Sequence, residues 1–172
     1  GELYDAPEVL GPERFDLVYT GIGALNWLPD ISGWAAVVGA LLRPDGRLHL
    51  REGHPQLFGA DDGRDDGLLC TEFPVAGAAG PTKFDEPSTY EGNGAPVEHS
   101  VTYQWNWSLG EIVTAVIRAG LRIDELVEHR TVPWNALGDA MHSVPPFGEY
   151  ELVDRPDRLA ATYTLTATKA AR

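Results

Sequence analysis

Along the first third of the chain, the pattern of hydrophobic and polar residues predicts a strand, then a helix, then a second strand. Residues 15–19 form a short apolar run, and the small residues Thr-Gly-Ile-Gly-Ala follow it directly. Asp30 is a suitable helix N-cap, and apolar residues then recur at helical spacing at Ile31, Trp34, Val37, Val38, Leu41 and Leu42. Arg-Pro-Asp-Gly at 43–46 predicts a turn, and alternation over 47–52 predicts a strand with one less buried face. The loop of this β-α-β unit lies at the carboxyl edge of the sheet, where ligands bind in open α/β sheets.

A second helix and strand are predicted downstream. Ser108 and Glu111 have the spacing of a capping box, an apolar stripe follows, and Gly120 is a suitable helix stop. Residues 121–129 form the next predicted strand. At the end of the chain, residues 159–169 alternate apolar residues with threonine. This pattern is typical of an antiparallel strand with one covered face.

The stretch between these units differs in composition. Residues 53–100 are rich in Gly, Pro and Asp, and only residues 68–75 look like a strand. The stretch ends in Val-Thr-Tyr-Gln-Trp-Asn-Trp at 101–107, which predicts a short strand with an aromatic face. Because so long a loop in a compact domain is commonly functional, we expect residues 53–107 to form a lid or a binding insertion within one domain spanning 1–172.

Charge and composition narrow the class of protein. The 172 residues include 26 acidic and 13 basic ones, with a formal net charge of −13, and no basic patch stands out. Nucleic acid and an anionic membrane surface are therefore poor partners. No apolar run approaches the length of a membrane span and no targeting leader is recognisable, so we expect a cytoplasmic protein. The single cysteine excludes an internal disulfide, and the histidine spacings indicate no metal site.

Several of these segments resemble the second half of class I S-adenosylmethionine-dependent methyltransferases. Residues 15–31 (FDLVYTGIGALNWLPDI) are similar to the family's fourth strand and its loop. Residues 41–55 (LLRPDGRLHLREGHP) are similar to its helix, turn and fifth strand, residues 111–130 to the next helix and sixth strand, and residues 163–169 (YTLTATK) to the closing antiparallel strand. The resemblance implies a Rossmann-like, doubly wound α/β sheet that is partial, from the fourth to the seventh strand. The family's glycine-rich cofactor loop and the acid after its second strand are missing from these 172 residues.

The resemblance also implies a cofactor site for S-adenosylmethionine. It places Glu2 against the adenine amino group and packs Leu3 on the adenine ring. It places the backbone of Thr20, Gly21, Ile22 and Gly23 along the methionine part of the cofactor, with Leu25 and Trp27 as walls. Two glycines let a ligand approach the backbone closely, which fits this assignment. The alternatives are that Glu2 is a frayed terminal residue and that Trp27 belongs to the core.

Candidates for catalysis and substrate binding lie close to the same edge. His54 directly follows the predicted strand 47–52 and is a candidate general base, although a histidine at a strand end is commonly structural. Tyr103, Trp105 and Trp107 are candidates for a substrate wall, and the alternative is ordinary core.

The function predicted from the sequence is methyl transfer to a small molecule by a larger domain of which this chain is a part. The alternative is a non-catalytic remnant or partner subunit that binds no cofactor by itself. A nicotinamide-dependent reductase is disfavoured, because Asn26 stands where the dinucleotide fingerprint needs its third glycine. A sheet that begins at its fourth strand exposes an edge, so we expect self-association or a partner that supplies the missing strands.

Overall fold

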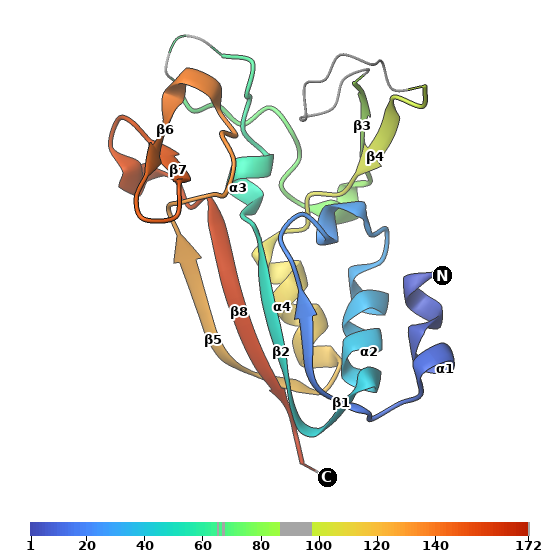
Figure 1. The fold of residues 1–172 in the computed structure, drawn as a ribbon. Helices are drawn as coiled ribbons and strands as arrows, with labels where there is room; N and C mark the ends of the chain where they lie inside the picture. Colours follow the sequence, from blue (N-terminus) through green and yellow to red (C-terminus); the bar gives the residue numbers. More distant parts are fainter. Residues whose placement is uncertain (65, 67, 87–97, 172) are drawn as a thin grey trace.

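The structure is a computed structural model that describes residues 1–64, 66, 68–86 and 98–171. Among these residues, the main sheet has the strand order β1-β2-β8-β5, and two hairpins stand above its carboxyl edge (Figure 1). The main sheet consists of β1 (Phe15–Thr20), β2 (Leu42–Gly53), β8 (Thr162–Lys169) and β5 (Leu121–His129). The hairpins pair β3 (Thr82–Asp85) with β4 (Val101–Gln104) and β6 (Met141–Val144) with β7 (Glu149–Leu152). The helices are α1 (Ala6–Leu10), α2 (Ile31–Leu41), α3 (Pro55–Phe58) and α4 (Leu109–Arg118).

The sheet is mixed, as the alternation in the sequence predicted. Strand β2 pairs with β1 in parallel, whereas β8 lies between β2 and β5 and is antiparallel to both. Leu48 and Leu50 of β2 are buried beside Leu165 and Ala167 of β8. Thr164, Thr166 and Thr168 of β8 alternate with these apolar residues and point to the other face, which is less deeply buried. The reversed last strand is thus confirmed.

Helices α2 and α4 pack against each other on one face of the sheet, where the main core lies. Asp30 caps α2 by accepting from Gly33 N at 2.9 Å, and the Ser108–Glu111 capping box begins α4. Both caps confirm the helix starts that the sequence predicted. On the opposite face of the sheet, Tyr19 is exposed and stacks on His49, with ring centroids 5.8 Å apart.

A second, smaller core lies beyond the carboxyl edge of the sheet. It joins Leu57 of α3 to the segment that carries β6 and β7, and it contains Val132, Met141 and Leu152. This core fixes the β6–β7 lobe above β5 and β8 (Figure 1). None of the described helices is both long enough and apolar enough to cross a membrane.

Three sequence predictions need correction. Residues 68–75 were expected to form a strand, but their described residues make only an isolated bridge, between Ala60 and Thr71. The strand expected over residues 101–107 ends at Gln104, because Trp105 N turns away to donate to Asn26 O at 2.8 Å. Strand β2 begins at Leu42 rather than at residue 47, and the predicted turn is a bulge within it in which Asp45 has φ +63°.

Candidate functional site

The candidate site lies at the carboxyl edge of the sheet, where β1 and β2 end. The loop after β1 covers residues 21–30 and leads into α2, and the chain after β2 leads into α3. Gly23 has φ +79°, a conformation that side chains rarely adopt, and a Cβ added there would meet no atom within 4 Å. The backbone at Gly23 therefore faces open space, as a loop that cradles a ligand requires.

Glu52, the last acidic residue of β2, fixes the shape of this loop. Its carboxylate accepts hydrogen bonds from Ala24 N and Leu25 N, each at 2.9 Å, and from Gly23 N. It also accepts from Gly53 N at 2.7 Å. Only 2% of Glu52 is exposed, so these N–H groups replace the water that the carboxylate would otherwise bind.

Burial and hydrogen bonding act on Glu52 in opposite directions. Burial raises the pKa of this carboxyl, and the hydrogen bonds from the loop backbone hold the pKa down in part. Tyr163 of β8 lies against Glu52, and its pKa is raised well above the usual value by burial and then by the Glu52 charge. The Tyr163 hydroxyl has no hydrogen-bond partner within the described part of the chain.

The predicted loop residues have different surroundings. Trp27 is 50% exposed to solvent, so the alternative that Trp27 belongs to the core is wrong. Leu25 is only 2% exposed, so its side chain packs in the main core, and only its N–H takes part in the Glu52 contact. Thr20 ends β1, and Gly21 and Ile22 form the turn between Thr20 and Gly23.

The first residues of the chain lie beside the start of α2. Leu3 is partly buried against the main core, and the Tyr4 hydroxyl lies 3.2 Å from both Asp30 N and Asp30 O. Glu2 begins a short 3₁₀ turn and accepts from Leu3 N at 3.2 Å. Because Asp30 also closes the loop after β1, residues 2–4 stand at the same edge of the sheet as that loop.

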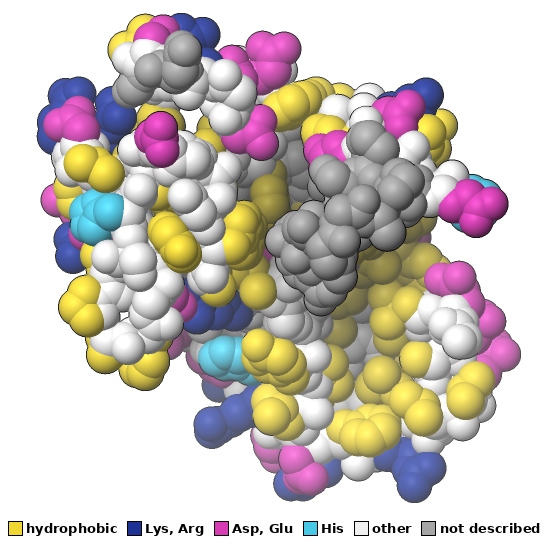
Figure 2. Space-filling view, turned by 45° about the horizontal axis from the view of Figure 1, so that its top comes forward, with side chains coloured by type: hydrophobic (Ala, Val, Ile, Leu, Met, Phe, Trp, Pro, Cys, Tyr) yellow, Lys and Arg dark blue, Asp and Glu magenta, His cyan; other side chains and the backbone are white. Residues whose placement is uncertain are grey.

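A cavity of about 490 Å³ opens next to this loop. Figure 2 shows it as a hollow between the β6–β7 lobe and the β3–β4 hairpin. Its walls come from the loop after β1, from α3, from both strands of the β3–β4 hairpin and from residues 134–137. The lining residues include five aromatic and two acidic side chains, namely Phe58, Phe73, Phe84, Trp105, Trp134, Asp62 and Glu86.

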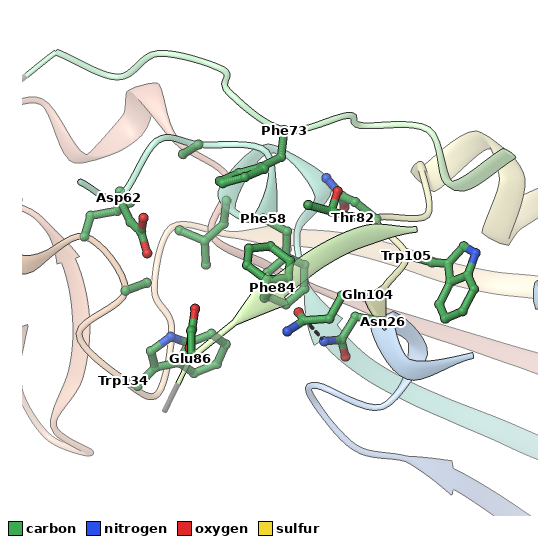
Figure 3. Close-up of a pocket in the computed structure, with 15 residues that line it drawn as sticks. Asn26, Phe58, Asp62, Phe73, Thr82, Phe84, Glu86, Gln104, Trp105 and Trp134 are labelled. Atoms are coloured by element: carbon green, nitrogen blue, oxygen red, sulfur yellow. Dashed lines mark hydrogen bonds between the residues drawn. The ribbon is translucent and has the colours of Figure 1, made fainter. Parts of the chain in front are cut away.

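The aromatic rings form most of one wall. Phe58 and Trp134 are nearly parallel, with 23° between their planes and 6.5 Å between centroids, and Phe73 and Phe84 lie 5.4 Å apart. Figure 3 shows Phe58, Phe73 and Phe84 gathered together, while Trp105 stands apart with its ring turned away from them.

The structure separates the three aromatics that were expected to form a substrate wall. Tyr103 is 52% exposed and does not line the cavity, whereas its neighbour Gln104 does. Trp107 packs against the main core and donates from Nε1 to Leu28 O at 3.0 Å. Trp105 alone of the three lines the cavity. The strand ends at Gln104, so the alternation that would have placed the three on one face does not continue.

His54 is buried, and both of its ring nitrogens have partners. Nδ1 accepts from Gln56 N at 3.0 Å and so caps α3, and Nε2 lies 2.9 Å from Glu128 Oε1. Burial lowers the pKa of His54, and Glu128 opposes this shift. His54 lines a neighbouring cavity with Glu128 and Arg158 and is not part of the aromatic one. The observed geometry thus engages Nδ1 in the cap of α3 and Nε2 in the contact with Glu128.

Sequence reasoning missed two parts of the site. Glu52 shares the buried face of β2 with Leu48 and Leu50, and an acid in phase with buried residues was a signal that could have identified it. The aromatic wall could not be found in this way, because its residues come from separate segments of the chain with no shared spacing. Among the described residues, no three His, Cys, Asp or Glu side chains are grouped as metal ligands would be.

The sequence matches no protein family model and no curated protein. Solved structures, in contrast, match over nearly the whole chain. A proposed S-adenosylmethionine-dependent methyltransferase from Listeria monocytogenes is 15% identical, with a TM-score of 0.58 over 99% of this chain and 68% of that one. A methyltransferase of the same kind from Mesorhizobium loti is 18% identical, with a TM-score of 0.51 over 92% of this chain and 63% of that one.

A third match is a chain of the complex between the Trm112 methyltransferase activator of Haloferax volcanii and a proposed methyltransferase. It is 13% identical, with a TM-score of 0.53, and the match covers 100% of this chain and 60% of that one. This chain therefore has the α/β fold of class I S-adenosylmethionine-dependent methyltransferases, as the sequence resemblance implied. It spans between 60% and 68% of the length of these three chains.

Proposed function

We propose that this chain is part of an S-adenosylmethionine-dependent methyltransferase that acts on a small molecule. The observation that carries the proposal is the loop after β1, which Glu52 holds at the carboxyl edge of the sheet by accepting from three of the loop's backbone N–H groups. In α/β sheets this edge is the usual ligand site. The solved S-adenosylmethionine-dependent methyltransferases of the same fold support the choice of cofactor.

The loop fits the methionine end of S-adenosylmethionine. The backbone of residues 20–23 contacts the cofactor, Gly23 leaves room for it, and the exposed ring of Trp27 shields it. Leu25 acts through its backbone, which Glu52 holds in place. Glu2 and Leu3 bind the adenine, since the next residue, Tyr4, contacts Asp30 at the end of the same loop. S-adenosylmethionine supplies the methyl group, and the chain's own residues align the reactants and exclude water.

The aromatic cavity binds the acceptor. Its volume of about 490 Å³ lies within the range of small-molecule sites, which is roughly 300–1,000 Å³. Asn26 lines it and belongs to the same loop that contacts the cofactor, so donor and acceptor meet across this loop. Residues 53–107 contribute most of the aromatic wall and form the substrate lid, of which residues 65, 67 and 87–97 lie outside the described part.

A partner, or another segment, completes the domain. The glycine-rich cofactor loop is missing from these 172 residues, and Leu17 and Tyr19 of the sheet's edge strand are exposed. The competing proposal is a methyltransferase-like subunit that does not bind the cofactor alone. It is supported by the partial coverage of the matched chains and by the activator complex among them.

Calorimetric titration with S-adenosylmethionine distinguishes the two proposals. It is done on this chain and on the chain completed by the polypeptide that supplies the missing strands. Gly23→Ala and Gly148→Ala form a matched pair, because both glycines have positive φ and only Gly23 lies in the loop. We expect the completed domain to bind, and Gly23→Ala alone to weaken binding. No binding by the completed domain, or equal binding by both variants, would refute the cofactor site.

A further inference from the structure

We propose that the acceptor is a small arylalkylamine, recognised as its ammonium cation in the aromatic cavity. This inference rests on the proposed function, because it names the substrate class of that site. Two features of the cavity carry it: the aromatic side chains of its walls and the sign of the charge that lines it.

The walls favour a flat, apolar body. Phe58 and Trp134 present nearly parallel rings, and Phe73 and Phe84 extend the aromatic surface. Aromatic groups stack against such faces, and a cation within about 6 Å of a ring centroid is attracted to its face. An aromatic ring that carries an ammonium group would use both properties.

The charges select a cation. Of the described residues that line the cavity, Asp62 and Glu86 are acidic, and none is Lys, Arg or His. Both carboxylates lie at the exposed mouth, and neither has an ion-pair or hydrogen-bond partner in the described part of the chain. The neighbouring cavity differs, since Arg158 and His54 both line it. An anionic ligand would meet two carboxylates here with no described cation to balance them.

Binding of three matched indoles tests the proposal: tryptamine as the cation, tryptophol as the neutral compound and indole-3-propionate as the anion. Ligand-observed NMR titrations are done on the whole chain. We expect tryptamine to bind about tenfold more tightly than tryptophol, since cation–π and ion-pair contacts add to the same stacking, and indole-3-propionate to bind weakest. An equal affinity for all three, or no binding of any, would overturn the proposal.

A pair of double variants separates the local charges from the net charge of −13. Asp62→Asn with Glu86→Gln should reduce the preference for tryptamine to within about twofold. Asp5→Asn with Glu8→Gln removes two exposed acids near α1, far from the cavity lining, and should leave the preference unchanged. If the preference for tryptamine survives in Asp62→Asn with Glu86→Gln, or is lost in Asp5→Asn with Glu8→Gln, the preference comes from the overall charge of the protein.

S-adenosylmethionine titration of the same samples keeps this proposal separate from the proposed function. Cofactor binding without selectivity among the indoles would overturn the substrate class and leave the methyltransferase proposal intact. Selectivity without cofactor binding by the completed domain would show an amine site on a protein that is not a methyltransferase.

Discussion

Replacing Glu52 with Gln should destabilise the loop after β1 more than any other isosteric change at this edge of the sheet. Each carboxylate oxygen accepts two N–H groups: Oε1 takes Gly23 N and Gly53 N, and Oε2 takes Ala24 N and Leu25 N. An amide keeps one oxygen, so two N–H groups lose their acceptor and face an NH₂ donor instead. A buried donor without an acceptor costs about 1–3 kcal/mol.

Removal of the buried charge offsets part of this cost, since burial disfavours the ionised form of Glu52. We therefore expect Glu52→Gln to lower the free energy of unfolding by about 2–4 kcal/mol. Urea denaturation measures the loss, and amide hydrogen exchange locates it at residues 23–25 and 53. S-adenosylmethionine binding by the completed domain should fall as well, because the loop that holds the cofactor loses its shape.

Glu111→Gln is the matched control. Glu111 also accepts from several groups, including Ser108 N at 2.8 Å and Gly77 N at 3.1 Å, but it stands at the start of α4. Glu111→Gln should lower the free energy of unfolding without changing amide hydrogen exchange at residues 23–25. Wild-type protection of those amides in Glu52→Gln, together with unchanged unfolding, would refute the assignment of Glu52 as the residue that shapes the loop.

Further predictions concern pH, the aromatic residues and assembly. Because the pKa of Glu52 is raised in the folded state, the folded protein holds the proton of this carboxyl more tightly than the unfolded chain does. The contribution of Glu52 to stability is therefore complete below about pH 4.5 and falls as the pH rises towards the pKa of the folded state. Glu52→Gln should remove this pH dependence of the unfolding free energy in urea denaturation. The pKa of His54 is lowered in the folded state, so the unfolding free energy should fall as the pH decreases below about 6.5. His54→Asn should weaken this pH dependence and leave the turnover of the completed enzyme within a few fold of the wild-type value. Trp107→Ala should cost about 3 kcal/mol of unfolding free energy, whereas Trp105→Ala should cost less and instead raise the Michaelis constant for the acceptor; equal losses of stability would contradict this division. Sedimentation should show self-association of the isolated chain that a partner with the missing strands suppresses, and a monodisperse monomer at high concentration would argue against the open edge.

Most of the sheet and its helices could be predicted because their signals are local. The Asp30 cap, the Ser108–Glu111 capping box and the stop at Gly120 depend on residues within one turn of each other. The threonine alternation of β8 depends only on the pleat of the strand. For these elements, neighbouring residues contain the information that sets the structure.

The two hairpins could not be predicted in this way. Strand β4 was predicted as the start of the strand expected over residues 101–107, but β3, β6 and β7, each four residues long, are too short for alternation to stand out from a loop. Their pairing depends on a partner strand elsewhere in the chain and on the small core beneath the β6–β7 lobe. The length of residues 53–107 indicated an insertion, but not which of its residues face a ligand.

The sequence by itself determined the β-α-β unit, the reversed last strand and the position of the loop after β1, since periodicity and caps act over a few residues. Only the tertiary structure decided what the side chains do. In the tertiary structure Glu52 holds that loop through its backbone N–H groups, and His54 caps α3. Trp105 lines the cavity, whereas Trp107 donates to Leu28 O. The tertiary structure also brought Phe58, Phe84 and Trp134 together from three segments. The physical reason is that burial and hydrogen bonding depend on neighbours in space, and packing of separate segments alone sets those neighbours.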